Sequence, residues 1–232
     1  MKRLIGLAAA LFLLVGCANP LPIPTMPSFA PMPSETAKPK PTVTLAPDAY
    51  TLREEVYEEE GVAIRFPQVA EDNYSRAGTI NTRLQMAAED DYTARWETEG
   101  LVLSVDWQAG RQDEVLSVFF TGEASVEGAV HPNAVCYAIT LDMANVRVRS
   151  LADYITSRED VEEAIAAGGF ALRHGDTDVF DTEAVAELVS AFFNAAPAAD
   201  NVRTFYLEAD ETVCLILEVP HAAGDYIIIA IV

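Results

Sequence analysis

Basic residues are scarce in this chain, and that scarcity limits what it can bind. Its 232 residues include 15 lysines and arginines against 36 aspartates and glutamates, which gives a formal net charge of −21 at pH 7. Such a surface repels a phosphate backbone and lacks the basic stripe that counterion release requires. We therefore expect no nucleic-acid partner.

Motifs for metal binding and catalysis are also missing. The histidines and cysteines of the folded part do not have the spacing of zinc ligands; they are His131, Cys136, His174, Cys214 and His221. No Gly-x-Ser-x-Gly elbow marks a nucleophilic serine. The sequence thus predicts no metal and no cofactor, and it identifies no catalytic residue.

The N-terminal segment 1–16 has the features of a bacterial signal peptide. Two basic residues precede an apolar stretch over 4–15, which is too short to span a bilayer. The stretch ends in Leu14-Val15-Gly16-Cys17, which resembles the lipobox of bacterial lipoproteins, whose cysteine is lipidated after cleavage. We therefore expect Cys17 to carry acyl chains and to anchor the protein to the cell membrane.

Proline dominates the segment that follows the expected lipidation site. Nine prolines occur among the thirty residues 18–47, a composition that favours extended polyproline-like chain over helix or sheet. Residues 17–47 are accordingly interpreted as a lipidated cysteine and a tether. A docking site for a proline-recognising partner is the alternative.

The remaining residues, 48–232, carry most of the charge. They contain 11 arginines, no lysine and 35 acidic residues, a net charge of −24. On the outer side of a membrane, such a domain attracts cationic partners and repels anionic ones. Solubility alone is the alternative explanation of the acidity.

Hydrophobic periodicity predicts an α+β domain, with a mostly antiparallel sheet packed by two or three helices. Alternating apolar residues favour strands, and a spacing of three to four favours helices. The strands are expected over 54–69, as a bent strand or a pair, and over 101–107, 115–120, 134–142, 205–207, 212–219 and 226–232. The helices are expected over 75–91, 159–167 and 181–194.

Three details of this pattern can be checked. Ala109-Gly110 is expected to form the turn of a hairpin, Asp181 to cap the third helix, and the apolar segment 226–232 to be a central strand buried on both faces. The domain is expected to divide near residue 110, into halves of about 48–110 and 111–232.

An ordered set of short motifs resembles the extracytoplasmic domain of the lysozyme-sensing anti-sigma-V factors, the RsiV-like family, which also occurs beside polysaccharide deacetylases. The most telling motif is the turn Gly128-Ala129-Val130-His131-Pro132-Asn133, followed by Leu141-Asp142 and then by the Leu-x-Asp segment Leu151-Ala152-Asp153-Tyr154. The matching segments are 66–68, 80–81, 116–118, 128–133, 141–142, 151–154, 205–207 and 222–224.

The resemblance implies an extracytoplasmic module that binds lysozyme in some members of the family. This chain departs from the family in its turn, where Ala129 and Val130 replace the usual Gly and Ala. It also has His221 where an aromatic residue is usual. In place of the family's cytoplasmic anti-sigma segment it has the lipoprotein leader, which argues against the same route of transcriptional control.

Two groups of residues are candidates for function or structural support. Gly128, His131, Pro132 and Asn133 form the turn, in which His131 is either buried and structural or exposed to a ligand. Cys136 and Cys214, an even pair in an oxidising compartment, are either a disulfide or two buried thiols.

Together these features predict a lipid-anchored surface protein with an extracytoplasmic ligand-binding domain. Its expected ligand is a basic protein such as lysozyme, or else a cell-wall component such as a glycan. Two alternatives remain: an envelope enzyme that acts on peptidoglycan or glycans, and a structural partner in an envelope complex.

Overall fold

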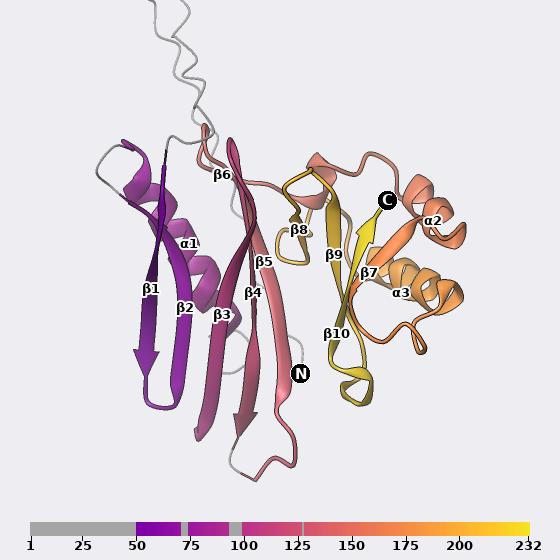
Figure 1. Cartoon of the computed structure of the whole chain (residues 1–232), viewed down its shortest axis with the longest axis horizontal. Helices are drawn as coiled ribbons and strands as arrows, with labels where there is room; N and C mark the ends of the chain where they lie inside the picture. The colour runs from indigo at the N-terminus through magenta and orange to yellow at the C-terminus, as the bar shows by residue number, and fades with distance from the viewer. Residues whose placement is uncertain (1–49, 71–73, 93–98, 127) are drawn as a thin grey trace, which may run out of the picture. The chain divides into compact units, whose positions relative to one another are not determined.

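The computed structural model describes residues 50–70, 74–92, 99–126 and 128–232 (Figure 1). All of them belong to one compact unit, residues 42–232. The expected signal peptide, Cys17 and the whole tether lie outside the described residues, so lipid anchoring stays a prediction. Among the helices described, none combines the length and the apolar character that a membrane crossing needs.

The first sheet, sheet A, has six strands in sequential order. Neighbouring strands are antiparallel except β2 and β3, which are parallel and are connected through helix α1. The elements are β1 (Leu52–Glu59), β2 (Val62–Val69), α1 (Ala77–Asp91), β3 (Leu101–Gln112), β4 (Val115–Val126), β5 (Asn133–Asp142) and β6 (Arg147–Val148).

Helix α1 covers one face of sheet A and closes the first hydrophobic core (Figure 1). Its buried residues Ile80, Leu84 and Ala88 recur every fourth position, so they form one apolar stripe on the helix. The buried Asn81 side chain accepts a hydrogen bond from the N–H of Val69 at 2.7 Å and donates to its carbonyl oxygen at 3.0 Å. This double contact fixes the helix against the end of β2.

The second sheet, sheet B, has four antiparallel strands in the order β7-β10-β9-β8. Helices α2 and α3 pack on one of its faces around the second core. The elements are the 3-10 turn η3 (Leu151–Asp153), α2 (Arg158–Ala166), β7 (Phe170–His174), α3 (Thr182–Ala195), β8 (Phe205–Leu207), β9 (Val213–Glu218), the 3-10 turn η4 (His221–Ala223) and β10 (Tyr226–Ile231).

The other face of sheet B packs against the outer face of β4 and β5, the face that α1 does not cover. Phe119 of β4 stacks on Tyr206 of β8 with ring centroids 4.3 Å apart. Close by, the buried Ser117 hydroxyl accepts a hydrogen bond from the N–H of Leu207 at 2.9 Å. Sheet B therefore covers the β5 side of sheet A, and among the described residues no element packs over the β1 side of the same face.

The fold class predicted from the sequence is confirmed: the domain is α+β, its strands are mostly antiparallel, and three helices pack on two sheets. Asp181 caps α3, since its carboxylate accepts a hydrogen bond from the N–H of Ala184. β10 is a central strand between β7 and β9, and nearly all of its residues are buried.

The structure corrects the expected turn at Ala109-Gly110. Strand β3 continues to Gln112, and the register shift between Ala109 and Arg111 makes Gly110 part of a bulge instead of the turn. Residue 110 thus lies inside the β3–β4 hairpin, and the change from sheet A to sheet B follows β6.

Candidate functional site

The candidate turn Gly128–Asn133 lies in the loop between β4 and β5 and is largely exposed. Gly128 adopts a left-handed conformation with φ 88°, which suits glycine. His131 and Pro132 are exposed, and Asn133 begins β5. A buried structural role for His131 is therefore wrong, and its imidazole is accessible from solvent.

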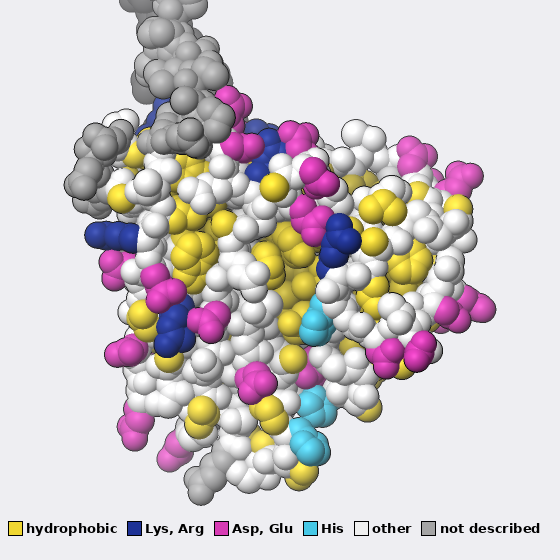
Figure 2. All heavy atoms as spheres, viewed as in Figure 1, with side chains coloured by type: hydrophobic (Ala, Val, Ile, Leu, Met, Phe, Trp, Pro, Cys, Tyr) yellow, Lys and Arg dark blue, Asp and Glu magenta, His cyan; other side chains and the backbone are white. Residues whose placement is uncertain are grey.

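Next to this turn, the loop between β9 and β10 contacts the start of β5. Asp225 accepts a hydrogen bond from the N–H of Ala134 at 2.6 Å, through Oδ2. Its Oδ1 lies 2.9 Å from Nδ1 of His221, a side chain that is half exposed. His174 of β7 stacks on Tyr226, with ring centroids 4.6 Å apart. Figure 2 shows histidine side chains on one face of the molecule, where sheet B meets sheet A.

Both candidate cysteines are thiols in this structure, which matches the second of the two alternatives. Cys214 is buried on β9, and Cys136 is half-buried on β5. Both belong to the apolar cluster between β5 and sheet B. Burial raises the pKa of the Cys214 thiol to about 11, so this thiol stays protonated and unreactive near neutral pH.

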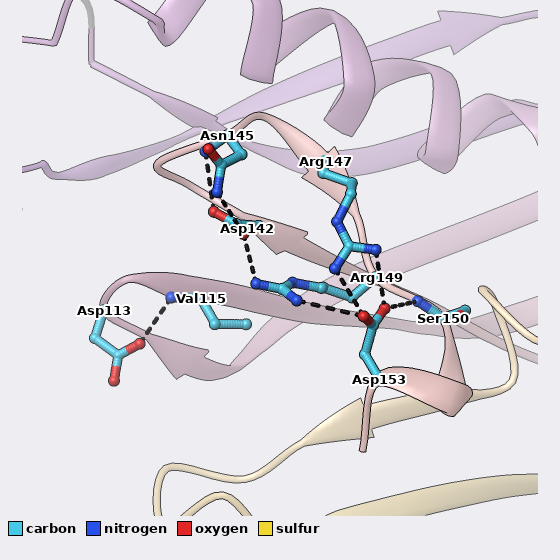
Figure 3. Close-up of polar contacts among 8 residues, drawn as sticks. All are labelled: Asp113, Val115, Asp142, Asn145, Arg147, Arg149, Ser150 and Asp153. Atoms are coloured by element: carbon cyan, nitrogen blue, oxygen red, sulfur yellow. Dashed lines mark hydrogen bonds and ion pairs between the residues drawn. The ribbon is translucent and has the colours of Figure 1, made fainter. Parts of the chain in front are cut away.

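The matching segments 141–142 and 151–154 meet in a network of ion pairs between β5 and η3 (Figure 3). Arg149 pairs with Asp142 and, at 3.3 Å, with Asp153. Arg147 makes two further hydrogen bonds to Asp153, at 2.7 and 3.2 Å, and the N–H of Ser150 adds one at 2.9 Å. The network joins the end of sheet A to the segment that leads into sheet B.

These contacts shift the acidity of both carboxyl groups. Hydrogen bonds from Arg147, from the backbone N–H of Ser150 and from Arg149 lower the pKa of Asp153 to about 2. Burial by itself would raise the pKa of Asp142, but hydrogen bonds from Asn145 and the contact with Arg149 outweigh burial and lower it. Both groups are therefore charged at neutral pH, and their role is structural.

The uncovered part of sheet A is acidic. Side chains alternate along each strand, so those of β1 to β4 that point away from α1 form one surface. Arg65 is the basic residue of this surface, with Asp106 at 3.2 Å and Glu54 at 3.9 Å. We call this surface the open acidic face; its charged residues are Glu54, Glu58, Arg65, Asp106 and Glu123.

Figure 2 shows the open acidic face, with acidic side chains spread over β1 to β4 and hydrophobic side chains in the hollow beside sheet B. Glu58 and Glu123 are exposed, and neither makes an ion pair with another described residue. Sequence reasoning found the acidity of the domain but not this surface. In the sequence, the alternation of Val102, Ser104 and Asp106 with buried residues indicates that one face of β3 is not in the core. Whether that face is also free of sheet B depends on where sheet B packs, which the sequence does not show.

Two of the cavities that described residues line are small and open at the surface of the domain. One, of about 300 Å³, lies between α3 and β9, with largely apolar walls and the polar residues Asn201, Thr204 and Glu218 at its border. The other, of about 120 Å³, lies between α1 and the edge of β5. Its lining residues are Arg83, Met86, Ala87, Asp90, Ala138, Ile139, Val148, Val202 and Arg203. Within the described ranges, no group of three or more His, Cys, Asp or Glu residues is arranged to hold a metal ion.

Comparison with known proteins gives a distant structural likeness and no match to a family model or a curated sequence. Among solved structures, the chain is similar to a crystal structure of a DUF3298 family protein from Pseudomonas aeruginosa PAO1. The sequence identity is 12%, the match covers 77% of this chain and 92% of that chain, and the TM-score is 0.36. At this level of similarity, function has to be argued from the chain's own residues.

Proposed function

We propose that the chain is a lipid-anchored envelope protein whose extracytoplasmic domain binds a basic protein through the open acidic face. The leader and the lipobox-like segment ending in Cys17 support the anchor. The proline-rich segment before residue 48 would serve as a spacer between membrane and domain. A basic muramidase such as lysozyme is the partner that the resemblance suggests.

The observation that carries this proposal is the position of the uncompensated charge. The open acidic face has four carboxylates and one guanidinium, so about three negative charges remain on one side of four strands. Sheet strands hold these side chains on a rigid backbone, so little order has to be gained on binding. Complementary charge would speed association and select cationic partners.

The apolar hollow beside the face adds a second element of recognition. Protein interfaces combine a desolvated apolar centre with a polar rim. Here the apolar cluster between β5 and sheet B includes the partly buried Phe119 of β4, a strand that also carries Glu123 of the open acidic face. A basic protein that covered both surfaces would bury apolar area while its lysines and arginines met the carboxylates.

Isothermal titration calorimetry of residues 48–232 with hen egg-white lysozyme tests the proposal. We expect binding that weakens as salt is raised, because exposed charges are screened beyond about 10 Å at 0.1 M salt. The double variant Glu58→Gln/Glu123→Gln should weaken binding about fivefold, since each exposed pair contributes up to about 1 kcal/mol.

The matched control removes the same charge elsewhere. Glu163 of α2 and Glu187 of α3 are exposed and lie outside the open acidic face. The variant Glu163→Gln/Glu187→Gln should bind as the unmodified domain does. If both double variants weakened binding equally, the effect would come from the net charge of the domain and not from the open acidic face. If the unmodified domain did not bind lysozyme, the basic-partner proposal would be refuted.

A further inference from the structure

The 120 Å³ cavity beside α1 concentrates positive charge in a domain that has little of it. Four of its lining residues come from one stripe of α1, because Arg83, Met86, Ala87 and Asp90 are spaced by three or four positions. Arg203 lines the cavity from the segment before β8. We call this cavity the α1–β5 pocket.

Arg203 is held in a fixed position at the pocket wall. Its Nη2 donates a hydrogen bond to the carbonyl oxygen of Ala87 at 2.8 Å, and its guanidinium lies 4.8 Å from the centre of the Tyr137 ring. Its own carbonyl oxygen accepts a hydrogen bond from the N–H of Ala138. Because these contacts already hold the Arg203 side chain in one conformation, it loses little conformational entropy when it binds a ligand.

Arg83 supplies a second guanidinium at the mouth. It is exposed, and in the part of the chain that the structure describes it forms no ion pair or hydrogen bond through its side chain. Asp90 lies 3.5 Å from Arg203 and neutralises part of that charge. With two cations and one anion, the pocket keeps a net charge of about +1 inside a domain of −24.

The rest of the pocket is apolar. Ile139 of β5, Val148 of β6 and Val202 form its walls together with two alanines. Met86 also lines the pocket and is 50% exposed, so its side chain can contact a ligand at the mouth. A volume of 120 Å³ equals that of about four water molecules in the liquid, which is enough for one small aliphatic group.

We propose that the α1–β5 pocket binds an aliphatic carboxylate. The aliphatic group would fill the space between Met86 and Ile139, and the carboxylate would accept hydrogen bonds from Arg83 and Arg203. The negative charge of the domain opposes this only weakly, because distant charges are screened within about 10 Å at 0.1 M salt and the guanidinium groups are in contact with the ligand. None of the lining residues belongs to the open acidic face, so the two sites are independent.

Nuclear magnetic resonance titration of residues 48–232 tests the proposal with three probes. They are 3-methylbutanoate, the peptide Gly-Gly-Val with a free carboxyl end, and the same peptide with an amide end. We expect saturable shifts of the backbone amides of Ala87, Ala138 and Val202, with a Kd on the order of 1 mM for so small a ligand. Binding of 3-methylbutanoate identifies a free carboxylate as sufficient; binding of the acid peptide alone identifies a peptide C-terminus.

Variants separate recognition from unfolding. Arg83→Gln should raise the Kd about fivefold or more, since it removes a charge-assisted hydrogen bond. Arg76→Gln, at the other end of α1 and outside the pocket, should leave the Kd unchanged. Val202→Phe should fill the pocket and abolish the shifts, while an unchanged amide spectrum elsewhere shows that the variant is folded.

Three results would overturn the proposal: no saturable shift with either carboxylate, equal binding of the amide peptide, or unchanged affinity in Arg83→Gln. The lysozyme titration is unaffected by any of them, because it reports on the open acidic face. Failure of one proposal is therefore distinguishable from failure of the other.

Discussion

Asp225 accepts a hydrogen bond from the backbone N–H of Ala134, 91 positions earlier in the sequence, and this bond joins the β9–β10 loop to the beginning of β5. The aspartate adopts φ 71°, a left-handed conformation that few residues other than glycine, asparagine and aspartate accept readily. The same carboxylate contacts His221. One side chain thus connects sheet A, sheet B and an exposed imidazole.

Replacing Asp225 should destabilise the domain measurably. Asp225→Ala loses the charged hydrogen bond and places alanine in a left-handed conformation, so we expect a loss of about 2 to 3 kcal/mol in the free energy of unfolding. Asp225→Asn keeps the backbone preference and should cost less. Urea denaturation measures both. His221→Ala removes only the exposed contact and should change the free energy of unfolding by less than about 1 kcal/mol. If Asp225→Ala cost no more than His221→Ala, the hydrogen bond to Ala134 would not stabilise the domain.

The free energy of unfolding should depend on pH partly through Asp153. Its pKa is lowered from 3.8 to about 2 in the folded state, so the folded carboxylate resists protonation more than the unfolded one does. The resulting stability is fully present above about pH 4 and is lost as the pH falls toward 2. Thermal unfolding between pH 2 and 7 should show a smaller dependence on pH in Asp153→Asn. The exposed Asp106→Asn is the control, and an identical profile in both variants would rule out this assignment.

Two glycines should respond to alanine with opposite signs. A Cβ at Gly110 would collide with the carbonyl oxygen of Leu207 and approach the Tyr206 ring, so Gly110→Ala should destabilise by about 1 to 3 kcal/mol. A Cβ at Gly78, in the first turns of α1, meets open space. Gly78→Ala should therefore stabilise by about 0.5 to 1 kcal/mol. Urea denaturation of the two variants compares them directly; destabilisation by Gly78→Ala would be inconsistent with the structure.

The cysteines give a covalent test. We expect mass spectrometry of the isolated domain, residues 48–232, without reductant, to find the mass of two thiols. Alkylation of Cys214 should be slow in the folded state, because burial raises its pKa to about 11, and fast after denaturation. A mass lower by two hydrogens, with no alkylation after denaturation, would show a disulfide instead.

Much of the fold was predictable because its strands and helices are long and regular. The alternation over 101–107 and the four-residue spacing from Ile80 to Ala88 identify β3 and α1 without tertiary information. Strand β7 was missed: it has five residues, all half-buried or exposed, and it follows directly on two glycines that mark a helix end. Its strand state depends on pairing with β10, which lies more than fifty residues further along the chain.

The candidate sites were less predictable, because each depends on which surfaces meet. The α1–β5 pocket joins Arg83 to Arg203 over 120 positions, and no local pattern connects them. The segments 141–142 and 151–154 were visible in the sequence, but the contacts that Arg147 and Arg149 make with their aspartates became evident only in three dimensions. The sequence indicated a turn over 128–133 but left open whether His131 is buried or exposed, and the structure shows it exposed.

Strand β5 is fastened near both ends, by Asp225 at Ala134 and by Arg149 at Asp142. Strand β5 cannot separate from sheet B without breaking the Asp225 contact together with the apolar cluster between β5 and sheet B. Amide hydrogens in β5 and β9 should therefore exchange with solvent at a common, slow rate set by global opening, whereas those of the edge strand β1 exchange earlier. In its opening behaviour the domain has one cooperative unit, although its chain is organised in two sheets.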